Sequence, residues 1–104
     1  MKYILNSPIL TNWGSFGFFP MTVELAREWV ADGDVQSAIG HTGTAALLSE
    51  ILGLNIPANR ISVKMNPGDE ALIIRVLQRL PEGTILSKEE LRSVPFELGL
   101  LLMW

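Results

Sequence analysis

The order of apolar and polar residues along the chain predicts a mixture of short strands and helices. Residues 2–5 form an apolar run that is typical of a short buried strand. Residues 16–21 predict a second strand, which Pro20 confines to a sheet edge because proline has no backbone N–H to donate to a neighbour. Residues 96–104 predict a final apolar strand that lies in the core or at a subunit interface.

The clearest alternation predicts a β-hairpin. Residues 60–65 alternate apolar and polar side chains, so every second residue would face the core: Ile61, Val63 and Met65. Residues 66–69 (Asn-Pro-Gly-Asp) place proline and glycine where a type II turn requires them. Residues 71–77 then follow as a strand that is apolar on both faces, which predicts a central position in the sheet.

The first predicted helix covers residues 22–31. Thr22 is a good N-cap, and the helical spacing places three large apolar residues on one face that would pack on the core: Leu25, Trp29 and Val30.

Two further helices are predicted. Residues 43–52 end at Gly53, a typical C-cap residue, and the buried face would carry Ala46, Leu47, Ile51 and Leu54. Ser87 and Glu90 form a capping box, which predicts the start of a short third helix.

Together these patterns predict a single α+β domain over residues 1–104. We expect about five strands in one mixed, largely antiparallel sheet, with about three helices packed on it. The composition is 48% hydrophobic and only 18% charged, which is apolar for a chain of 104 residues. A second copy would cover the surplus apolar surface, so we expect a homodimer.

The charge and the scarcity of metal ligands narrow the functional classes. The net charge is −3, and eight Lys and Arg residues spread along the chain argue against binding to polymeric DNA or RNA. The chain has no cysteine and one histidine, which excludes disulfides, thiolate zinc sites and cysteine nucleophiles. We predict no metal and no cofactor. No apolar run approaches the roughly 20 residues that span a bilayer, so no membrane association and a cytoplasmic location are expected.

One stretch, residues 37–44, combines the chain's only histidine with the residues of an anion site. Gly40, Thr42, Gly43 and Thr44 are small, and they precede or open the helix predicted at 43–52. The first amides of a helix lack intrahelical acceptors and lie at the positive end of its dipole, where phosphate binds readily. His41 could donate a proton to a group attached to that phosphate.

Further polar residues follow the predicted central strand, where Gln78, Arg79 and Glu82 cluster as the strand stops. One histidine with phosphate-binding amides suits the cleavage of an RNA-type phosphodiester, in which the 2′-OH of the substrate attacks the phosphorus. The protein then supplies geometry, charge stabilisation and an acid for the departing 5′-oxygen, and no metal is required.

Four segments give the chain a resemblance to a known family. Residues 38–41 (Ala-Ile-Gly-His), 59–65, 68–74 and 78–83 (Gln-Arg-Leu-Pro-Glu-Gly) resemble the viral ring nucleases in order and spacing. These are the type III anti-CRISPR proteins of archaeal viruses and phages, with relatives in bacterial type III CRISPR loci. The start and the end of the chain are more similar to the bacterial and phage branch.

The resemblance implies a fold, a substrate and residue roles. The family is a homodimer on a mixed sheet that binds cyclic tetra-adenylate across the dimer and cuts it, without metal, to linear di-adenylate with a 2′,3′-cyclic phosphate. His41 matches the general acid of the family. Arg79 matches its phosphate clamp, Glu82 matches a catalytic glutamate that orients a ribose hydroxyl, and Gln78 is a candidate ligand contact.

The first loop departs from the family pattern. Archaeal virus members carry a serine there that positions the reacting ribose, whereas a direct count places Ile9 at that position. Ser7 or Thr11 could substitute for it, and with Asn6 they are the candidate ligand contacts of this loop. The loop, which contains the large aromatic Trp13, is either a ligand-binding loop or a simple surface connection whose Trp13 packs on the core.

Other interpretations stay open. Lys64 and Arg60 could contact phosphate, but on an exposed strand face they would be solvated instead. The same pocket would serve a non-catalytic sponge or sensor for a cyclic oligonucleotide. In a third reading the protein is a structural or regulatory dimer, and His41 is a hydrogen-bonded capping residue.

Overall fold

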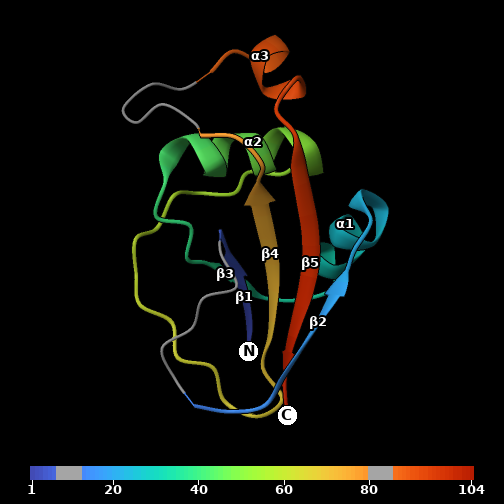
Figure 1. Cartoon of the computed structure of the whole chain (residues 1–104), viewed down its shortest axis with the longest axis vertical. Coiled ribbons are helices and arrows are strands. Elements are labelled where there is room, and N and C mark those ends of the chain that lie inside the picture. The colour runs from blue at the N-terminus through green and yellow to red at the C-terminus, as the bar shows by residue number, and fades with distance from the viewer. Residues whose placement is uncertain (7–12, 80–85) are drawn as a thin grey trace.

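The computed structural model describes residues 1–6, 13–79 and 86–104, and these form one mixed sheet of five strands with three helices (Figure 1). The strands follow the order β2-β5-β4-β1-β3 across the sheet. Their bounds are β1 Lys2–Leu5, β2 Phe16–Pro20, β3 Val35–Ser37, β4 Glu70–Val76 and β5 Phe96–Met103. The helices are α1 Val23–Ala31, α2 Thr42–Leu52 and α3 Lys88–Arg92. The predicted α+β class with five strands and three helices is confirmed.

The two halves of the sheet differ in strand direction. β1 runs parallel to both of its neighbours, so Ile4 pairs with Ser37 of β3 on one side and with Leu72 of β4 on the other. β5 runs antiparallel to both β4 and β2. The predictions that β2, with Pro20, lies at an edge and that β4 is central are therefore confirmed.

The prediction of a strand at residues 60–65, the first strand of the hairpin, is wrong. Residues 60–65 form no strand, and β4 pairs with β1 and β5 instead. The alternating pattern predicts a strand, but this segment forms no ladder of backbone hydrogen bonds with the sheet. It contacts the sheet only through individual apolar side chains. Met65 is 1% exposed, whereas Ile61 is 39% exposed and faces away from the core.

The turn that follows is confirmed. The Asp69 amide donates to the Asn66 carbonyl oxygen at 2.9 Å, and Gly68 has a φ of +93°, which favours glycine. The Asn66 amide in turn donates to Asp69 Oδ2 at 2.8 Å. This hydrogen bond lowers the pKa of Asp69 below its ordinary value, although partial burial opposes the shift.

The sequence pattern misses β3. This strand has three residues and only Ser37 is buried, so no alternation is long enough to reveal it. It forms because β1 offers a free edge: the Ala38 amide donates to the Ile4 carbonyl oxygen at 2.8 Å. β3 thus replaces the strand that was wrongly expected at residues 60–65.

Helix α1 begins as predicted, because Thr22 Oγ1 accepts from the Leu25 amide at 3.2 Å. The predicted packing face is wrong at Leu25, which is 52% exposed, while Ala26 and Trp29 are buried. The orientation follows from Trp29, whose indole Nε1 donates to Glu70 Oε1 at 2.8 Å. That bond turns the helix so that the Ala26 side, and not the Leu25 side, meets the sheet.

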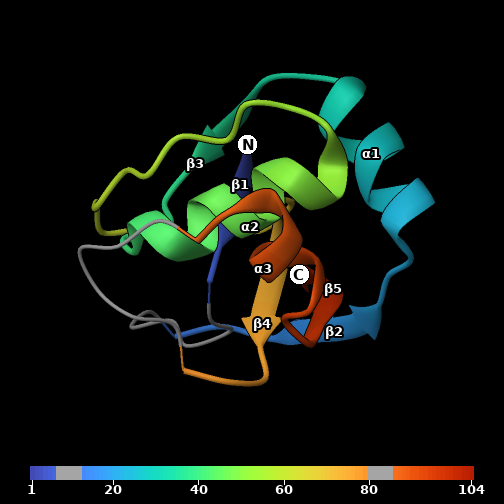
Figure 2. The ribbon, with the colours of Figure 1, turned by 90° about the horizontal axis from the view of Figure 1, so that it is seen from above.

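Helix α2 runs across the strands on one face of the sheet (Figures 1 and 2). It ends at Gly53, whose φ of +67° confirms the predicted left-handed C-cap. Of the predicted buried face, Leu47 is buried and Ala46 and Ile51 are partly buried against the core, and Leu48 and Leu52 are buried as well. Leu54 is 40% exposed because it follows the end of the helix.

The capping box predicted for α3 is confirmed, because Ser87 and Glu90 each hydrogen-bond to the amide of the other. The Ser87 amide and hydroxyl lower the pKa of Glu90. Within the described residues, no helix is long and apolar enough to cross a membrane.

The sheet has two unequal faces. The three helices cover one face, and their buried residues join strand residues such as Ile4, Leu72 and Ile74 in the main core. A smaller cluster on the other face, including Met65 and Ile73, is covered by the segment before the 66–69 turn. Among the described residues, no segment covers the antiparallel half of this second face, where Phe18 is 44% exposed.

Candidate functional site

The topology brings the ends of three parallel strands to the same edge of the sheet. β1, β3 and β4 run in one direction, so their carboxyl ends lie together. Asn6 follows β1, the segment to His41 follows β3, and Gln78 and Arg79 follow β4. Ligands of open sheets with parallel strands bind outside such carboxyl ends, where the chain leaves in opposite directions. Sequence-distant candidate residues are thereby placed at one edge.

His41 is the N-cap of α2. Its backbone is extended (φ −115°, ψ 119°), and its Nδ1 accepts a hydrogen bond from the Thr44 amide at 3.1 Å. The Thr44 hydroxyl Oγ1 lies 3.3 Å from the same nitrogen. Because Nδ1 uses its lone pair as an acceptor, the ring proton of neutral His41 in this arrangement sits on Nε2. The ring is half-buried, and Nε2 makes no hydrogen bond to a described residue.

The capping interaction changes which amides can bind an anion. The first intrahelical bond is from the Ala45 amide to the His41 carbonyl oxygen, at 3.1 Å. The amides of Thr42 and Gly43 precede it and have no intrahelical acceptor. The Thr44 amide, predicted to bind a ligand, is occupied by His41. Thr42 is exposed, whereas Gly43 and Thr44 are buried.

A second segment holds the approach to α2 in place. The Ser37 hydroxyl donates to the Pro57 carbonyl oxygen at 2.6 Å. The Asn59 amide donates to the Ile39 carbonyl oxygen at 2.8 Å, and its side-chain amide donates to the Ser37 carbonyl oxygen at 2.9 Å. These bonds fix residues 37–40 against residues 57–60 from both sides.

Arg60 lies beside the α2 N-terminus and not on an exposed strand face, where the alternation of residues 60–65 predicts it to be solvated. Its Nη2 donates to the Gly40 carbonyl oxygen at 3.1 Å. The side chain passes over Gly40 so closely that a Cβ there would lie 3.4 Å from Arg60 Nε. Arg60 has no carboxylate partner in the part of the chain that the structure describes. A cation that no described carboxylate pairs with therefore lies next to the candidate anion site.

The remaining predicted residues are placed less fully. Asn6, Gln78 and Arg79 are exposed, and Arg79 has no ion pair with a described residue. Ser7, Ile9, Thr11 and Glu82 lie outside the described residues. Trp13 is 97% exposed, so it is not packed on the core. No three His, Cys, Asp or Glu side chains gather within residues 1–6, 13–79 and 86–104.

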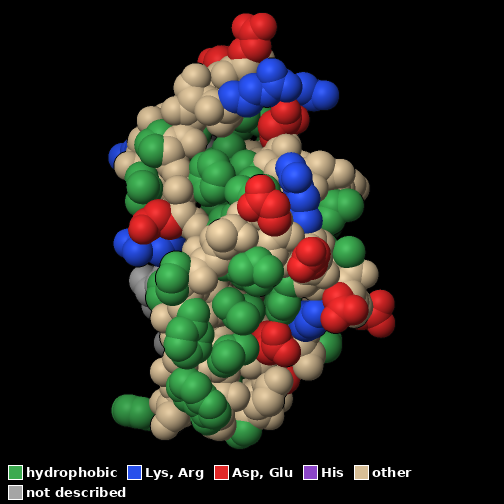
Figure 3. All heavy atoms as spheres, turned by 90° about the vertical axis from the view of Figure 1, so that its right-hand side faces the viewer, with side chains coloured by type: hydrophobic (Ala, Val, Ile, Leu, Met, Phe, Trp, Pro, Cys, Tyr) green, Lys and Arg blue, Asp and Glu red, His purple; other side chains and the backbone are tan. Residues whose placement is uncertain are grey.

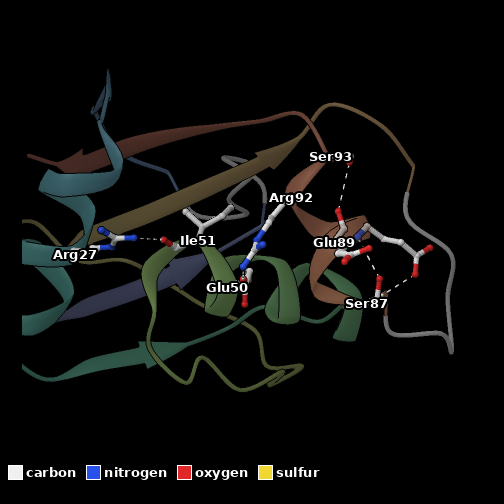
Figure 4. A network of polar contacts seen from close by, with 8 residues as sticks. Arg27, Glu50, Ile51, Ser87, Glu89, Arg92 and Ser93 are labelled. Atoms are coloured by element: carbon white, nitrogen blue, oxygen red, sulfur yellow. Dashed lines mark hydrogen bonds and ion pairs between the residues drawn. The ribbon is translucent and has the colours of Figure 1, made fainter.

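The opposite end of α2 is tied to its neighbours (Figure 4). Arg27 of α1 donates to the Ile51 carbonyl oxygen at 2.8 Å, and Arg92 of α3 pairs with Glu50 Oε1 at 3.5 Å. These contacts are exposed and individually weak. Together they attach α1 and α3 to the C-terminal half of α2, so its N-terminus faces away from the other two helices.

A hollow of about 170 Å³ lies elsewhere, on the open face of β2, β5 and β4. Phe18, Pro20 and Gly99 line it, and the ion pair between Arg75 Nη1 and Glu97 Oε1 (3.3 Å) stands at its rim. Figure 3 shows hydrophobic side chains gathered on the side of the molecule that carries β2. The hollow contains none of the predicted site residues, so we treat it as a surface for contacts and not as the reactive site.

Comparisons with known proteins agree with this fold. A family model described as STIV B116-like matches residues 2–98. The uncharacterized protein ORF116 of Acidianus filamentous virus 1 is 41% identical over 103 residues, covering 94% of this chain and 87% of its own. ORF117 of Acidianus two-tailed virus is 36% identical over 102 residues, covering 92% and 87%. The solved structure of B116 from Sulfolobus turreted icosahedral virus matches with a TM-score of 0.76 at 31% identity, over 97% of each chain.

Proposed function

The chain belongs to the STIV B116-like family, and on that premise we propose that it is a metal-independent ring nuclease. Its substrate would be cyclic tetra-adenylate, and its product linear di-adenylate with a 2′,3′-cyclic phosphate. The resemblance of four sequence segments to viral ring nucleases supplies the substrate. The observation that carries the chemistry is the position of the only histidine, at the N-terminus of α2 with Nδ1 held and Nε2 unengaged by described residues.

The proposed reaction uses a nucleophile from the substrate. The 2′-oxygen forms a bond to the adjacent phosphorus and loses its proton to solvent or to a base, while the bond from phosphorus to the 5′-oxygen breaks. The leaving 5′-oxygen takes a proton from His41 Nε2 once the ring carries its second proton. Cutting two bonds of the ring in this way gives two linear products.

Charge stabilisation would come from groups around the helix start. The amides of Thr42 and Gly43, which have no intrahelical acceptor, and the guanidinium of Arg60 could donate hydrogen bonds to the scissile phosphate. From the resemblance, Arg79 would clamp phosphate and Glu82 would orient the ribose hydroxyl. Gln78 and Gly40 would line the ligand.

A homodimer would complete the site. The chain has a net charge of −3, and a ring with four phosphates requires more positive groups than one edge of the sheet offers. The exposed aromatics of β2, Phe18 at 44% and Phe19 at 46%, give a second copy an apolar surface to cover. The Arg75–Glu97 pair beside them carries both signs of charge, so across a two-fold axis each residue could face its opposite in the second copy.

The cap on His41 also favours a second candidate function. A histidine that accepts from the Thr44 amide fulfils a structural role, which is compatible with a protein that binds the cyclic oligonucleotide as a sponge or sensor without cutting it. The two functions differ in a product that can be measured.

The test is product chromatography after incubation of the protein with cyclic tri-, tetra- and hexa-adenylate in EDTA. Linear di-adenylate from the tetramer supports the nuclease. A thermal shift with the tetramer and no linear product supports the sponge or sensor. Neither a shift nor a product with any ring contradicts both.

A further inference from the structure

We propose that Thr44 is a positioning residue that keeps the His41 ring in place through gain and loss of a proton. The inference rests on the proposed role of His41 as the proton donor. It assigns Thr44 a task other than the ligand contact predicted from the sequence.

The geometry places two Thr44 groups on the same ring nitrogen. The backbone amide lies 3.1 Å from His41 Nδ1, and the hydroxyl Oγ1 lies 3.3 Å from it. Thr44 is 6% exposed, so its hydroxyl is withdrawn from bulk water and meets a defined partner. It sits on the first turn of α2, which is anchored at its other end by the Arg27 and Arg92 contacts.

The amide and the hydroxyl serve different protonation states of the ring. An amide can only donate, so it stabilises the neutral ring, whose Nδ1 accepts. When the ring is charged, Nδ1 carries a proton and needs an acceptor. The Thr44 hydroxyl can donate or accept, so it is the group in reach that can hold Nδ1 in the charged state. When the charged ring gives its Nε2 proton to the leaving oxygen, the remaining proton is on Nδ1, so the hydroxyl can hold Nδ1 before and after the transfer. The amide holds the resting ring, whose proton is on Nε2, and Nε2 stays pointed at the substrate in each case.

The charged groups around the ring make such an acceptor necessary. The first turn of α2 contains no acidic residue that could accept a hydrogen bond from a protonated Nδ1. Arg60, from the neighbouring segment, and Arg79, which follows β4, are cations and can only donate. Asn6, after β1, is neutral, and Glu82 lies outside the described residues. Among the described residues, the Thr44 hydroxyl is thus the side-chain group in contact with Nδ1 that can act as an acceptor.

The experiment compares Thr44→Val with Thr44→Ser. Valine has the shape of threonine and keeps the amide but removes the hydroxyl, whereas serine keeps both. Since His41 is the chain's only histidine, its ring nitrogens give a single set of ¹⁵N NMR signals that needs no assignment. These are followed with pH in the ligand-free protein, together with the thermal midpoint and the single-turnover cleavage rate.

We expect the ¹⁵N signals of the ring to follow a different course with pH in Thr44→Val and to be retained in Thr44→Ser, because the valine variant loses a hydrogen bond to Nδ1. Cleavage should slow by about 10-fold to 10²-fold in Thr44→Val, with ligand affinity kept, and recover in Thr44→Ser. Equal ring titration in both variants and the parent overturns the inference, even if the parent cleaves its ligand. A parent protein that never cleaves contradicts the proposed function instead, and the assignment of Thr44 to the reaction falls with it.

Discussion

Arg60 and Gly40, twenty positions apart in the sequence, meet at the start of α2, where Arg60 Nη2 donates to the Gly40 carbonyl oxygen at 3.1 Å. The contact fixes a guanidinium beside the turn that carries His41. It also leaves the other guanidinium nitrogens without an ion-pair partner among the described residues. The hydrogen bond thus holds the Arg60 guanidinium, the proposed phosphate-binding charge, against the backbone that leads into α2.

Replacing this cation should weaken ligand binding. For Arg60→Gln we expect a loss of affinity for cyclic tetra-adenylate of about 10-fold to 10²-fold, since one charge-assisted contact to phosphate is removed. Isothermal titration with a non-cleaving His41 variant as background measures it. Arg92→Gln is the matched control, because Arg92 is paired with Glu50 in the C-terminal half of α2, away from the candidate site. Equal affinities for the two variants would exclude Arg60 from the site.

Close packing over Gly40 predicts a second, milder effect. In Gly40→Ala the new Cβ would lie 3.4 Å from Arg60 Nε, at the limit of ordinary van der Waals contact, so a small shift of the Arg60 side chain accommodates it. We expect nearly unchanged stability and a lower affinity for the ligand. Gly33→Ala is a suitable control, because a Cβ at Gly33 meets only the flexible end of Lys2, at 3.8 Å. A Gly40→Ala variant that binds as tightly as the parent would show that the Arg60 position is unimportant.

The cap of α2 at its other end gives a prediction about stability alone. Gly53 has a φ of +67° and open space around its Cα, so Gly53→Ala introduces backbone strain without a clash. The free energy of unfolding should fall by about 1 kcal/mol, as measured by urea denaturation. Cleavage per folded molecule should not change. If the variant is fully folded but cleaves more slowly, a change at the C-terminus of α2 must alter the site at its N-terminus, which would contradict this prediction.

Asp69 predicts a dependence of stability on pH. Its pKa is lower in the folded protein than the ordinary 3.8, chiefly because of the Asn66 amide. A lowered pKa stabilises the fold at every pH above about 3.8, and this contribution is lost as the pH falls through the folded value. Asp69→Asn should therefore destabilise the protein by about 1 kcal/mol at pH 7 and by less in strong acid. Urea midpoints of both proteins at pH 7 and below pH 3.8 test this, and a difference independent of pH would contradict it.

The sequence predicted the elements that carry local signals. Thr22, Gly53 and the Ser87–Glu90 pair mark helix ends through hydrogen bonds within a few residues, and all of them are confirmed. Pro20 correctly indicated an edge strand, since the reason is a missing donor in that residue itself.

Features that depend on distant contacts could not be predicted in this way. Residues 60–65 have the alternation of a strand, but β5 already pairs with the side of β4 opposite β1 and leaves no free edge. β3 is too short for a pattern and forms on the free edge of β1. Leu25 is exposed because the bond from Trp29 to Glu70 sets the rotation of α1.

In the candidate site, too, the features set by local sequence signals were predictable, and those set by distant contacts were not. The position of His41 at a helix start was readable from the glycines, the threonines and the apolar helix after it. Its hydrogen bond to Thr44 was raised only as an alternative reading, because capping by histidine has no strong sequence signature. The place of Arg60 was missed because the segment was expected to be a strand, although Asn59 and Arg60 belong to a segment that carries the family resemblance.

Two variants of His41 should distinguish its role as a helix cap from its proposed role in cleavage. His41→Ala loses the cap and should lose about 1 kcal/mol of the free energy of unfolding. His41→Asn retains a side-chain oxygen that can accept from the Thr44 amide, so its stability should stay near that of the parent. Both variants should still bind the ligand. An Asn variant that unfolds as readily as the Ala variant would contradict the capping role.

The most direct test of the proposed function is the single-turnover rate of cyclic tetra-adenylate cleavage in EDTA by the parent and by His41→Asn. If His41 is the proton donor, the parent forms linear di-adenylate and the folded variant binds the ring but cleaves it about 10² to 10⁴ times more slowly. Equal rates for the two proteins, or no linear product from the parent, would contradict the account.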